Sequence, residues 1–385
     1  MRYYIIFLFL TSSAFTSSKN YIIYHKKIQI AELLIRKGNY REALASYQAV
    51  FNDFEIAFYK DLHNASLCAI KDGNYDLAIK YCEKLVIQGY LLIDFNATGF
   101  SKLKSTLKWN RFVQRYDKLR SYYLSTVDQN MNQKLHDIFE KDQIAASSGN
   151  IEFQDSVFYG NALLLNKIYV SEGFPNCNIY KDTMLLNILA PLRHYFGLVN
   201  RLNDNHGQYE GRIYENMNLS SICLNQLFYD ALIQGKILPT TYADNISYFD
   251  SENRFGKLVL RIDFDKEKVE FMPWINEERL NDINQLRVSV GLFPFDNSTS
   301  YLLNNTWYSK YPFREIKSAM MNCESCKSKL DYILLESRIA SQFSEQYNKE
   351  YDKFGFILVD YSNVNHSYLV GIKPYMRNAN NSNSK

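Results

Sequence analysis

Apolar residues recur at intervals of three and four along the first part of the chain, which predicts a run of amphipathic helices over about residues 26–145. Two groups show this spacing, each on one face of an expected helix: Ile28, Ala31, Leu34 and Ile35, and then Leu67, Ala69 and Ile70. The run stops at Ser147–Asn150, whose small and polar residues favour a turn.

The same spacing continues through the middle of the chain. Helices are expected over residues 154–171, 181–198, 216–234 and 276–290, because apolar positions again follow the helical period. Gly173-Phe174-Pro175 and Gly235-Lys236 interrupt these segments, as residues that break helices do.

Around residues 257–271 the apolar positions follow a period of two, which is typical of strands. Residues 257–262 and 268–271 flank Asp263–Glu267 and predict a β-hairpin. Near the C-terminus, two further strands are expected over residues 355–360 and 367–372, after a helical stretch. The fold class expected is therefore mainly α, with N-terminal helical hairpins, a helical middle domain with a small β-hairpin, and a C-terminal α+β extension.

One sequence pattern occurs twice, 35 residues apart: Gly38-Asn39-Tyr40-Arg41-Glu42-Ala43-Leu44 is echoed by Gly73-Asn74-Tyr75-Asp76-Leu77-Ala78-Ile79. A period of about 34 residues is typical of helix–turn–helix repeats. Glycine suits the turn because it tolerates positive φ. The alanine early in the second helix lets two helices approach closely, and the tyrosine can fill the gap at the turn.

These residues resemble the tetratricopeptide (TPR) family. The first repeat is matched by Ala31, Gly38, Tyr40, Ala43 and Tyr47, and the second by Gly73, Tyr75 and Ala78. In the second repeat Cys82 occupies the position that Tyr47 has in the first, and the proline that usually closes a TPR repeat is absent from both. The alternative is that these segments are an unrelated pair of helical hairpins. Because two repeats are fewer than the three that a stable stack needs, residues 109–123 are expected to supply capping helices. The resemblance implies a binding surface rather than an active site.

The middle region, about residues 135–294, resembles an uncharacterised, mainly helical domain that follows TPR-like repeats in exported bacterial proteins. The residues that carry this likeness are Asp142-Gln143, Asp155, Asn161, Glu172-Gly173-Phe174-Pro175, His194, Gly235-Lys236-Ile237, Tyr242-Ala243 and Arg287–Leu292. Phe174 stands where that family prefers Trp, and the 261–271 hairpin lacks its Tyr-Gly-Thr-Gln run. The family brings no established activity.

The first residues predict export. Met1-Arg2 is followed by the apolar run Tyr3–Leu10 and then by small residues up to Ala14, which is the pattern of a signal peptide over residues 1–18. A buried N-terminal element is the alternative. The mature protein is expected to be soluble and periplasmic or extracellular, with no membrane insertion after signal removal. The expected domains are repeats at 26–125, a helical domain at 130–295, an α+β extension at 300–375 and a disordered tail at 376–385.

The composition limits which partners and which cysteine chemistry are expected. The chain of 385 residues carries 44 basic and 41 acidic residues, and this near balance argues against a nucleic-acid partner.

Of six cysteines, Cys68 and Cys82 are expected to be buried apolar residues. Cys323 and Cys326 form a single C-x-x-C, for which a disulfide or free thiols are favoured over redox catalysis and over zinc, which needs a second pair of ligands.

Five polar residues of the middle region are candidates for a site. His194 with the carboxylate of Asp155 could perform acid–base chemistry, Arg287 could hold an anionic group, and Asp142 and Asn161 could bind a ligand. Each also has a structural interpretation, as a helix-end carboxylate, a buried amide or a core histidine. Gly-x-Ser-x-Gly, His-Glu-x-x-His and phosphate-binding glycine loops are absent from the sequence, and no cofactor or metal is expected.

Two functions follow from these patterns. The first is an exported protein whose TPR-like surface binds a peptide or a partner protein, and it requires a groove lined by polar and aromatic residues from the first helices of both repeats. The second is a cell-envelope hydrolase acting on a cell-wall or glycan substrate, and it requires His194 within hydrogen-bond reach of a carboxylate.

Overall fold

The fold was determined as a computed structural model, and it is mainly helical in the part of the chain it describes. The described residues are 20–176, 183–204, 214, 217–248, 254–255, 260–263, 268–271, 276–294 and 354–357. The expected signal peptide, the Cys323/Cys326 pair, most of the C-terminal extension and the polar tail lie outside these residues.

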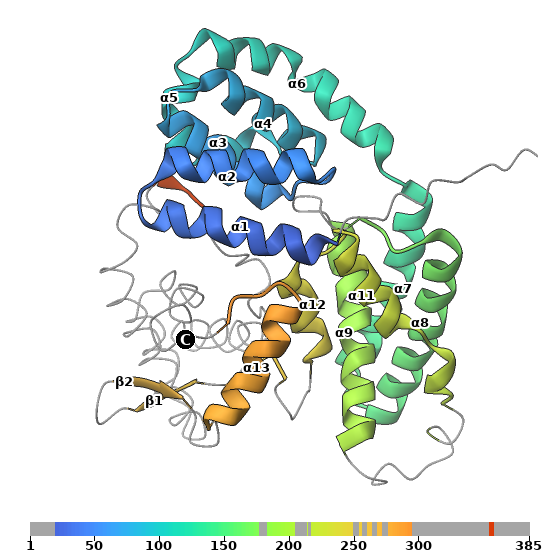
Figure 1. The fold of residues 1–385 in the computed structure, drawn as a ribbon. Helices are drawn as coiled ribbons and strands as arrows, with labels where there is room; N and C mark the ends of the chain where they lie inside the picture. Colours follow the sequence, from blue (N-terminus) through green and yellow to red (C-terminus); the bar gives the residue numbers. More distant parts are fainter. Residues whose placement is uncertain are drawn as a thin grey trace, which may run out of the picture.

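The N-terminal unit is a row of antiparallel helices, each packed on the next (Figure 1). It consists of α1 (Tyr21–Arg36), α2 (Tyr40–Asp53), α3 (Tyr59–Lys71), α4 (Tyr75–Ile87), the short turns η1 (Leu92–Asn96) and η2 (Thr98–Phe100), α5 (Ser101–Lys104) and α6 (Leu107–Thr126). The long α6 lies along α4 and covers the end of the row, where the sequence predicted a capping helix.

The two echoed turns have the same geometry. Gly38 and Gly73 both take positive φ, 78° and 76°, immediately after α1 and α3, as the sequence predicts. In each turn the glycine N–H donates to the carbonyl three residues earlier, and the following asparagine N–H donates to the carbonyl five residues earlier. The repeated sequence therefore encodes a repeated helix end.

The core of this unit confirms the role of its small residues. Ala43 and Ala78 are fully buried where consecutive helices meet, and so are Cys68 and Cys82. Burial raises the pKa of both thiols, which keeps them protonated and unreactive. The interpretation of these two cysteines as buried apolar residues is confirmed.

The middle unit is a helical bundle that lies beside one end of α1 (Figure 1). Its helices are α7 (Gln129–Ser147), α8 (Ile151–Glu172), α9 (Thr183–Asp204), η3 (Leu219–Ser221), α11 (Leu224–Ile233), α12 (Pro239–Ile246) and α13 (Glu277–Ser289). α9 packs on both α7 and α8, and α12 packs on α9. Strands β1 (Leu260–Asp263) and β2 (Lys268–Phe271) pair in antiparallel register, with Leu260 opposite Phe271.

Side-chain hydrogen bonds explain two places where the helix boundaries differ from the sequence prediction. α8 begins at Ile151 rather than at residue 154, because the Asn150 side chain accepts a hydrogen bond from the Phe153 N–H. The helix expected over 216–234 is divided, since η3 ends before α11 begins at Leu224. Between them, the Cys223 N–H donates to the side chain of Asn166 on α8 and not to a helical carbonyl.

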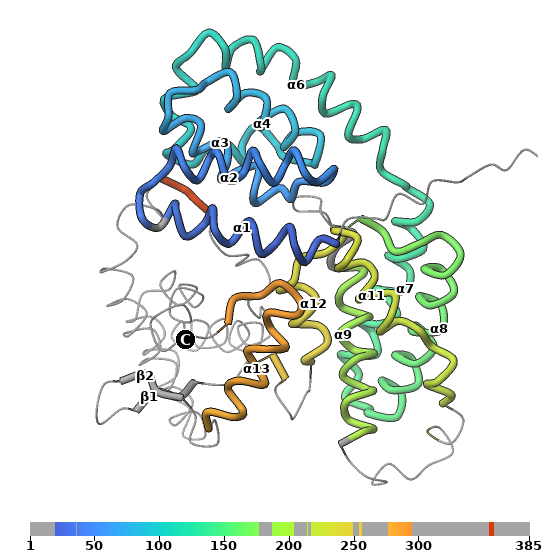
Figure 2. Tube along the Cα trace, viewed as in Figure 1, coloured from blue at the N-terminus to red at the C-terminus, as the bar shows by residue number. Residues whose placement is uncertain are grey.

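Two glycines join the middle unit to α1, the helix at the edge of the N-terminal unit that contacts α11 (Figure 2). A Cβ on Gly235, after α11, would lie 2.5 Å from the Tyr21 ring, and a Cβ on Gly291, after α13, would lie 3.1 Å from the His25 Cβ. The Gln29 side chain donates to the Gly291 carbonyl at 2.8 Å. Two of the three glycine turns that carry the resemblance of the middle region therefore serve as contacts with α1.

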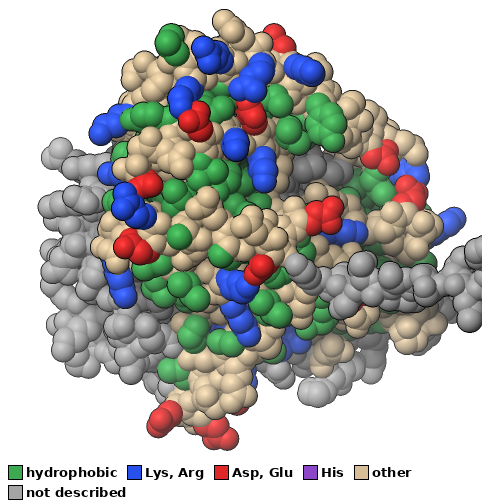
Figure 3. Space-filling view, turned by 45° about the horizontal axis from the view of Figure 1, so that its top comes forward, with side chains coloured by type: hydrophobic (Ala, Val, Ile, Leu, Met, Phe, Trp, Pro, Cys, Tyr) green, Lys and Arg blue, Asp and Glu red, His purple; other side chains and the backbone are tan. Residues whose placement is uncertain are grey.

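The face of the molecule seen in Figure 3 mixes basic, acidic and apolar side chains, with Lys and Arg interspersed among Asp and Glu. Among the described helices, none combines the length and hydropathy that a bilayer-spanning helix requires.

Candidate functional site

The side of the N-terminal unit formed by α1 and α3 buries an unusual set of polar side chains. Glu32 on α1 and, on α3, Lys60, Asp61, His63 and Asn64 are all at most 8% exposed. Charged residues are almost never this buried unless they are paired. On α3, Lys60 precedes His63 and Asn64 by three and four residues, and Asp61 precedes Asn64 by three, so these pairs are neighbours on the helix surface. We refer to these five buried residues together as the polar groove.

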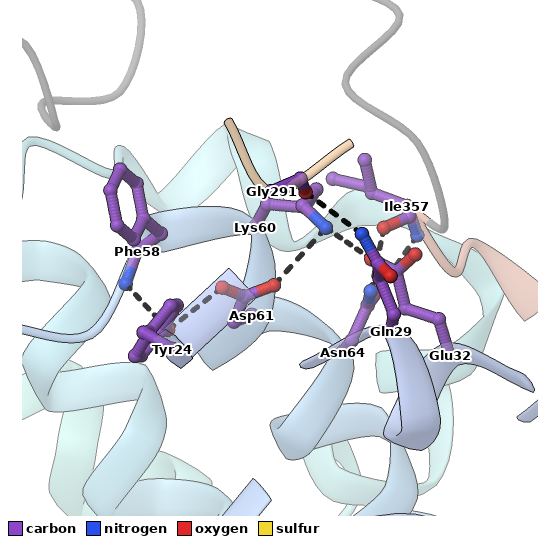
Figure 4. Close-up of polar contacts among 9 residues, drawn as sticks. All are labelled: Tyr24, Gln29, Glu32, Phe58, Lys60, Asp61, Asn64, Gly291 and Ile357. Atoms are coloured by element: carbon purple, nitrogen blue, oxygen red, sulfur yellow. Dashed lines mark hydrogen bonds and ion pairs between the residues drawn. The ribbon is translucent and has the colours of Figure 1, made fainter. Parts of the chain in front are cut away.

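An ion cluster forms the base of the polar groove (Figure 4). The Lys60 ammonium contacts the Glu32 carboxylate and lies 3.2 Å from Asp61 Oδ1. The Tyr24 hydroxyl donates to Asp61 Oδ2 at 2.7 Å and accepts from the Phe58 N–H. Burial acts to lower the pKa of Lys60, but Asp61 and Glu32 outweigh it, and the pKa lies above its usual value. Lys60 therefore stays charged.

A segment from near the other end of the chain occupies the polar groove. Asn64 binds both backbone groups of Ile357: its Oδ1 accepts from the Ile357 N–H at 2.7 Å, and its Nδ2 donates to the Ile357 carbonyl at 2.6 Å (Figure 4). His63 Nε2 lies 2.8 Å from the Gly355 carbonyl. Because a carbonyl only accepts, Nε2 carries the proton, and Nδ1 is left to accept from the Tyr90 hydroxyl at 3.0 Å.

Aromatic rings hold the side chains of the same segment. Tyr40 stacks on Phe356 with 5.6 Å between ring centroids and 2° between ring planes, and Phe356 in turn stacks on Phe354 at 5.5 Å. The Lys71 ammonium lies 3.9 Å above the centre of the Phe354 ring, within the range of a cation–π contact. Tyr40 and Lys71 thus add a stacking contact and a cation–π contact to the hydrogen bonds made by the polar groove.

Two glycines make the fit between segment and groove possible. A Cβ on Gly99 would lie 2.4 Å from the Phe354 carbonyl oxygen, so only glycine leaves room for the segment there. Gly355 has a φ of +92°, and a Cβ on it would lie 2.6 Å from the Ala97 Cβ. The close approach therefore depends on both residues.

The candidate site of the middle unit is partly assembled. His194 Nδ1 on α9 lies 2.7 Å from Asp142 Oδ2 on α7, and the His194 ring stacks on Phe158 at 4.5 Å. Asp142 is fully buried and also accepts from the Gln143 side chain. Its second oxygen has no hydrogen-bond partner among the described residues. Because the carboxylate accepts from Nδ1–H, the neutral tautomer that this geometry selects has its lone pair on Nε2.

Asp155 belongs to a neighbouring pair rather than to His194. Its carboxylate contacts the Arg201 guanidinium and accepts from the Tyr214 hydroxyl at 3.1 Å. Burial raises the pKa of Asp155, although Arg201 acts to lower it. Arg201 follows His194 by seven residues, so that α9 presents both on one side. Asn161 donates to the Ile138 carbonyl at 3.4 Å, which is the structural role that its type allows.

Arg287 holds a local turn. Its guanidinium donates to the Phe293 carbonyl at 2.7 Å and to the Phe255 carbonyl at 2.8 Å. The first bond closes the turn after α13, and the second ties the end of α13 to another segment of the middle unit. Of the five residues chosen from sequence, the structure thus joins Asp142 to His194, and it gives Asp155, Asn161 and Arg287 other partners.

Sequence reasoning named no residue of the polar groove, although it expected a groove on the first helices of the two repeats. The signal was present in α3, where Lys60, Asp61, His63 and Asn64 interrupt an otherwise apolar helix face. From the sequence alone, these polar residues would be assigned to a solvent-exposed face, because polar side chains are mostly exposed in folded proteins.

Within the described part of the chain, no group of three His, Cys, Asp or Glu side chains is arranged to hold a metal ion. The chain matches no protein-family model, no curated protein and no solved structure.

Proposed function

We propose that this protein is an exported binding protein, whose TPR-like polar groove on α1 and α3 binds a peptide segment of a partner protein. The observation that carries the proposal is the pair of hydrogen bonds by which Asn64 binds the N–H and carbonyl of one residue, Ile357. A side-chain amide that binds both groups recognises peptide backbone as such. It therefore suits a peptide ligand better than a glycan or a nucleotide.

The energetics of the groove favour this use. Asn64 is fully buried, and an amide that loses its hydrogen bonds there costs about 1–3 kcal/mol. The groove is consequently most stable with a backbone against Asn64. Tyr40 adds a flat ring on which an aromatic side chain stacks, at little cost in conformational entropy.

The binding proposal is tested with a displayed library of random peptides selected on the purified full chain. Peptides enriched on the wild type are expected to lose at least ten-fold in affinity on Asn64→Ala, because both backbone hydrogen bonds are removed. Asn161→Ala is the matched control, since Asn161 is also a buried helical asparagine but lies outside the groove. Equal binding to all three proteins would contradict the proposal.

The proposal of export has its own test. The expected domain order is a signal peptide, TPR-like repeats, the helical domain with its hairpin and the α+β extension. N-terminal sequencing of the protein from its native cell is expected to begin between about Phe15 and Asn20, because signal peptidase cleaves after small residues. Intact Met1 on soluble protein from the cytoplasm would overturn the localisation.

A cell-envelope hydrolase remains the second candidate, and one observation favours it. His194 donates from Nδ1 to the buried carboxylate of Asp142, an arrangement that orients a histidine and leaves Nε2 to act as a base. Against this, the same bond serves equally well to satisfy a core carboxylate.

His194→Gln separates these two roles. We expect a loss of about 1–3 kcal/mol in the free energy of unfolding, because Asp142 would lose a hydrogen bond in a buried position. Peptide binding at the polar groove should be unchanged. Loss of a measured hydrolytic activity on cell-wall fragments, at an unchanged melting temperature, would instead favour the hydrolase.

A further inference from the structure

We propose, resting on the function above, that residues Phe354–Ile357 are an internal stand-in for the partner. The groove then takes segments of the sequence aromatic–Gly–aromatic–X, where X is any residue except proline, and the chain's own segment has to leave before a partner can bind. The polar groove is thus a peptide-binding site that is closed by part of its own chain.

The contacts of the segment are those of a bound ligand. It is distant in sequence, since 292 residues separate His63 from Gly355. Its polar contacts pass from groove side chains to segment backbone, at Gly355 and Ile357. Hydrogen bonds of this kind would be available to any chain in the same backbone conformation.

Each position of the proposed motif has a physical reason. The first aromatic residue meets the Lys71 ammonium, as Phe354 does. Glycine follows because the positive φ and the contact with Ala97 exclude a side chain. The second aromatic residue stacks on Tyr40, as Phe356 does. The last position must carry an N–H for Asn64 Oδ1, which proline lacks.

Because the chain's own segment occupies the polar groove, a partner has to compete with that segment for binding. A segment tethered to its own groove competes as an intramolecular ligand, at an effective concentration that a free peptide has to overcome. A free peptide therefore binds weakly to the intact chain, unless the internal segment is weakened. A natural partner overcomes this by a tighter segment or by further contacts outside the groove.

Gly355→Ala is the variant that opens the groove without altering it. The added Cβ would meet Ala97, and alanine is strained at the φ of +92°. The matched control is Gly149→Ala, at a φ of +71° with nothing within 4 Å of the added Cβ and far from the groove in sequence. Phe354→Ala, which removes the cation–π contact, is a second opening variant with the groove intact.

The probe is a fluorescent synthetic peptide with the sequence of residues 352–359, measured by anisotropy on the full chain. We expect Gly355→Ala and Phe354→Ala to bind it at least ten-fold more tightly than the wild type and Gly149→Ala do. Adding Asn64→Ala to Gly355→Ala should abolish the gain. Peptides carrying alanine at the glycine, or proline at the last position, should bind at least ten-fold more weakly.

Two outcomes would overturn the inference. If the opening variants bind the probe no better than the wild type, while their melting temperatures fall, Phe354–Ile357 is only part of the core. If the library instead yields Asn64-dependent peptides that lack the motif and do not compete with the probe, the motif is wrong although the binding function stands. Failure of the function itself is a separate result: no Asn64-dependent peptide on either the wild type or Gly355→Ala.

Discussion

Lys60→Met is expected to lower the free energy of unfolding by about 3–5 kcal/mol, the typical cost of breaking a buried ion pair. Lys60 lies between the carboxylates of Glu32 and Asp61, and all three residues are at most 8% exposed. Methionine fills a similar volume, so packing changes little, but it leaves two carboxylates facing each other without a cation. Urea unfolding at pH 7, followed by circular dichroism, measures the difference.

Lys27→Met is the matched control. Lys27 is also paired with an aspartate, Asp53, but their side chains are 43% and 50% exposed. The same substitution should therefore cost no more than about 1 kcal/mol, as exposed ion pairs do. Equal losses for the two variants would mean that the cluster at Lys60 is solvated, and that the polar groove is open to water.

The partners of Lys60 also allow the cluster to be dissected. In Glu32→Gln the trio keeps one cation and one anion, since Asp61 remains beside Lys60. Combining Glu32→Gln with Lys60→Met should then cost less than the sum of the two single changes, because the double variant leaves one buried carboxylate without a cation, whereas Lys60→Met alone leaves two. Additive losses would indicate that the two residues do not interact.

The local parts of the fold could be predicted from the sequence. The turns at Gly38 and Gly73 depend on residues within one turn of a helix, so the repeated pattern was sufficient to place them. The ends of α13 followed in the same way from Asn276, whose side chain caps the helix, and from Gly291. The burial of Ala43 and Ala78 followed from the repeat.

The occupant of the groove could not be predicted, because its contacts are long-range. Nothing near Asn64 in the sequence indicates that Ile357 will meet it. Residues 356–359 are four consecutive apolar residues, and the sequence predicted a strand over 355–360; in the described part of that range, residues 355–357, no strand forms. A strand-like pattern is equally typical of a segment that places alternate side chains in a groove, and only the fold distinguishes the two.

For the candidate site of the middle unit, the sequence identified two residues that contact each other but did not predict that they are partners. Asp142 and His194 were both chosen, yet His194 was expected to act with Asp155 and Arg287. Asp155 pairs instead with Arg201, which sequence reasoning did not select. Opposite charges on different helices pair according to how the helices are rotated, and that rotation is a property of the packed bundle and not of either helix alone.

Stability is expected to fall with pH below the normal titration range of histidine, because two histidines are buried in their neutral form. Burial is the main cause that lowers the pKa of His25 to about 3 and that of His63 to about 4, from 6.5. Lys60 lowers the pKa of His25 further. Between pH 6.5 and about 4 the unfolded chain binds these protons and the folded chain does not. Each histidine then costs up to about 1.4 kcal/mol per pH unit. Asp155, whose pKa is raised, acts in the opposite direction.

His25→Phe tests how much His25 contributes to this pH dependence of stability. The His25 Nε2 has no hydrogen-bond partner among the described residues, and the ring packs 4.9 Å from Phe58, so a phenyl ring suits the site. We expect the variant to unfold near the wild-type urea concentration at pH 7.5 and to be the more stable protein at pH 5. His136→Phe, at an exposed position, is the control for the substitution itself. If His25→Phe leaves the pH dependence unchanged, His25 is accessible to protons in the folded state. The side of α1 that carries His25, against which Gly291 packs, would then open without global unfolding.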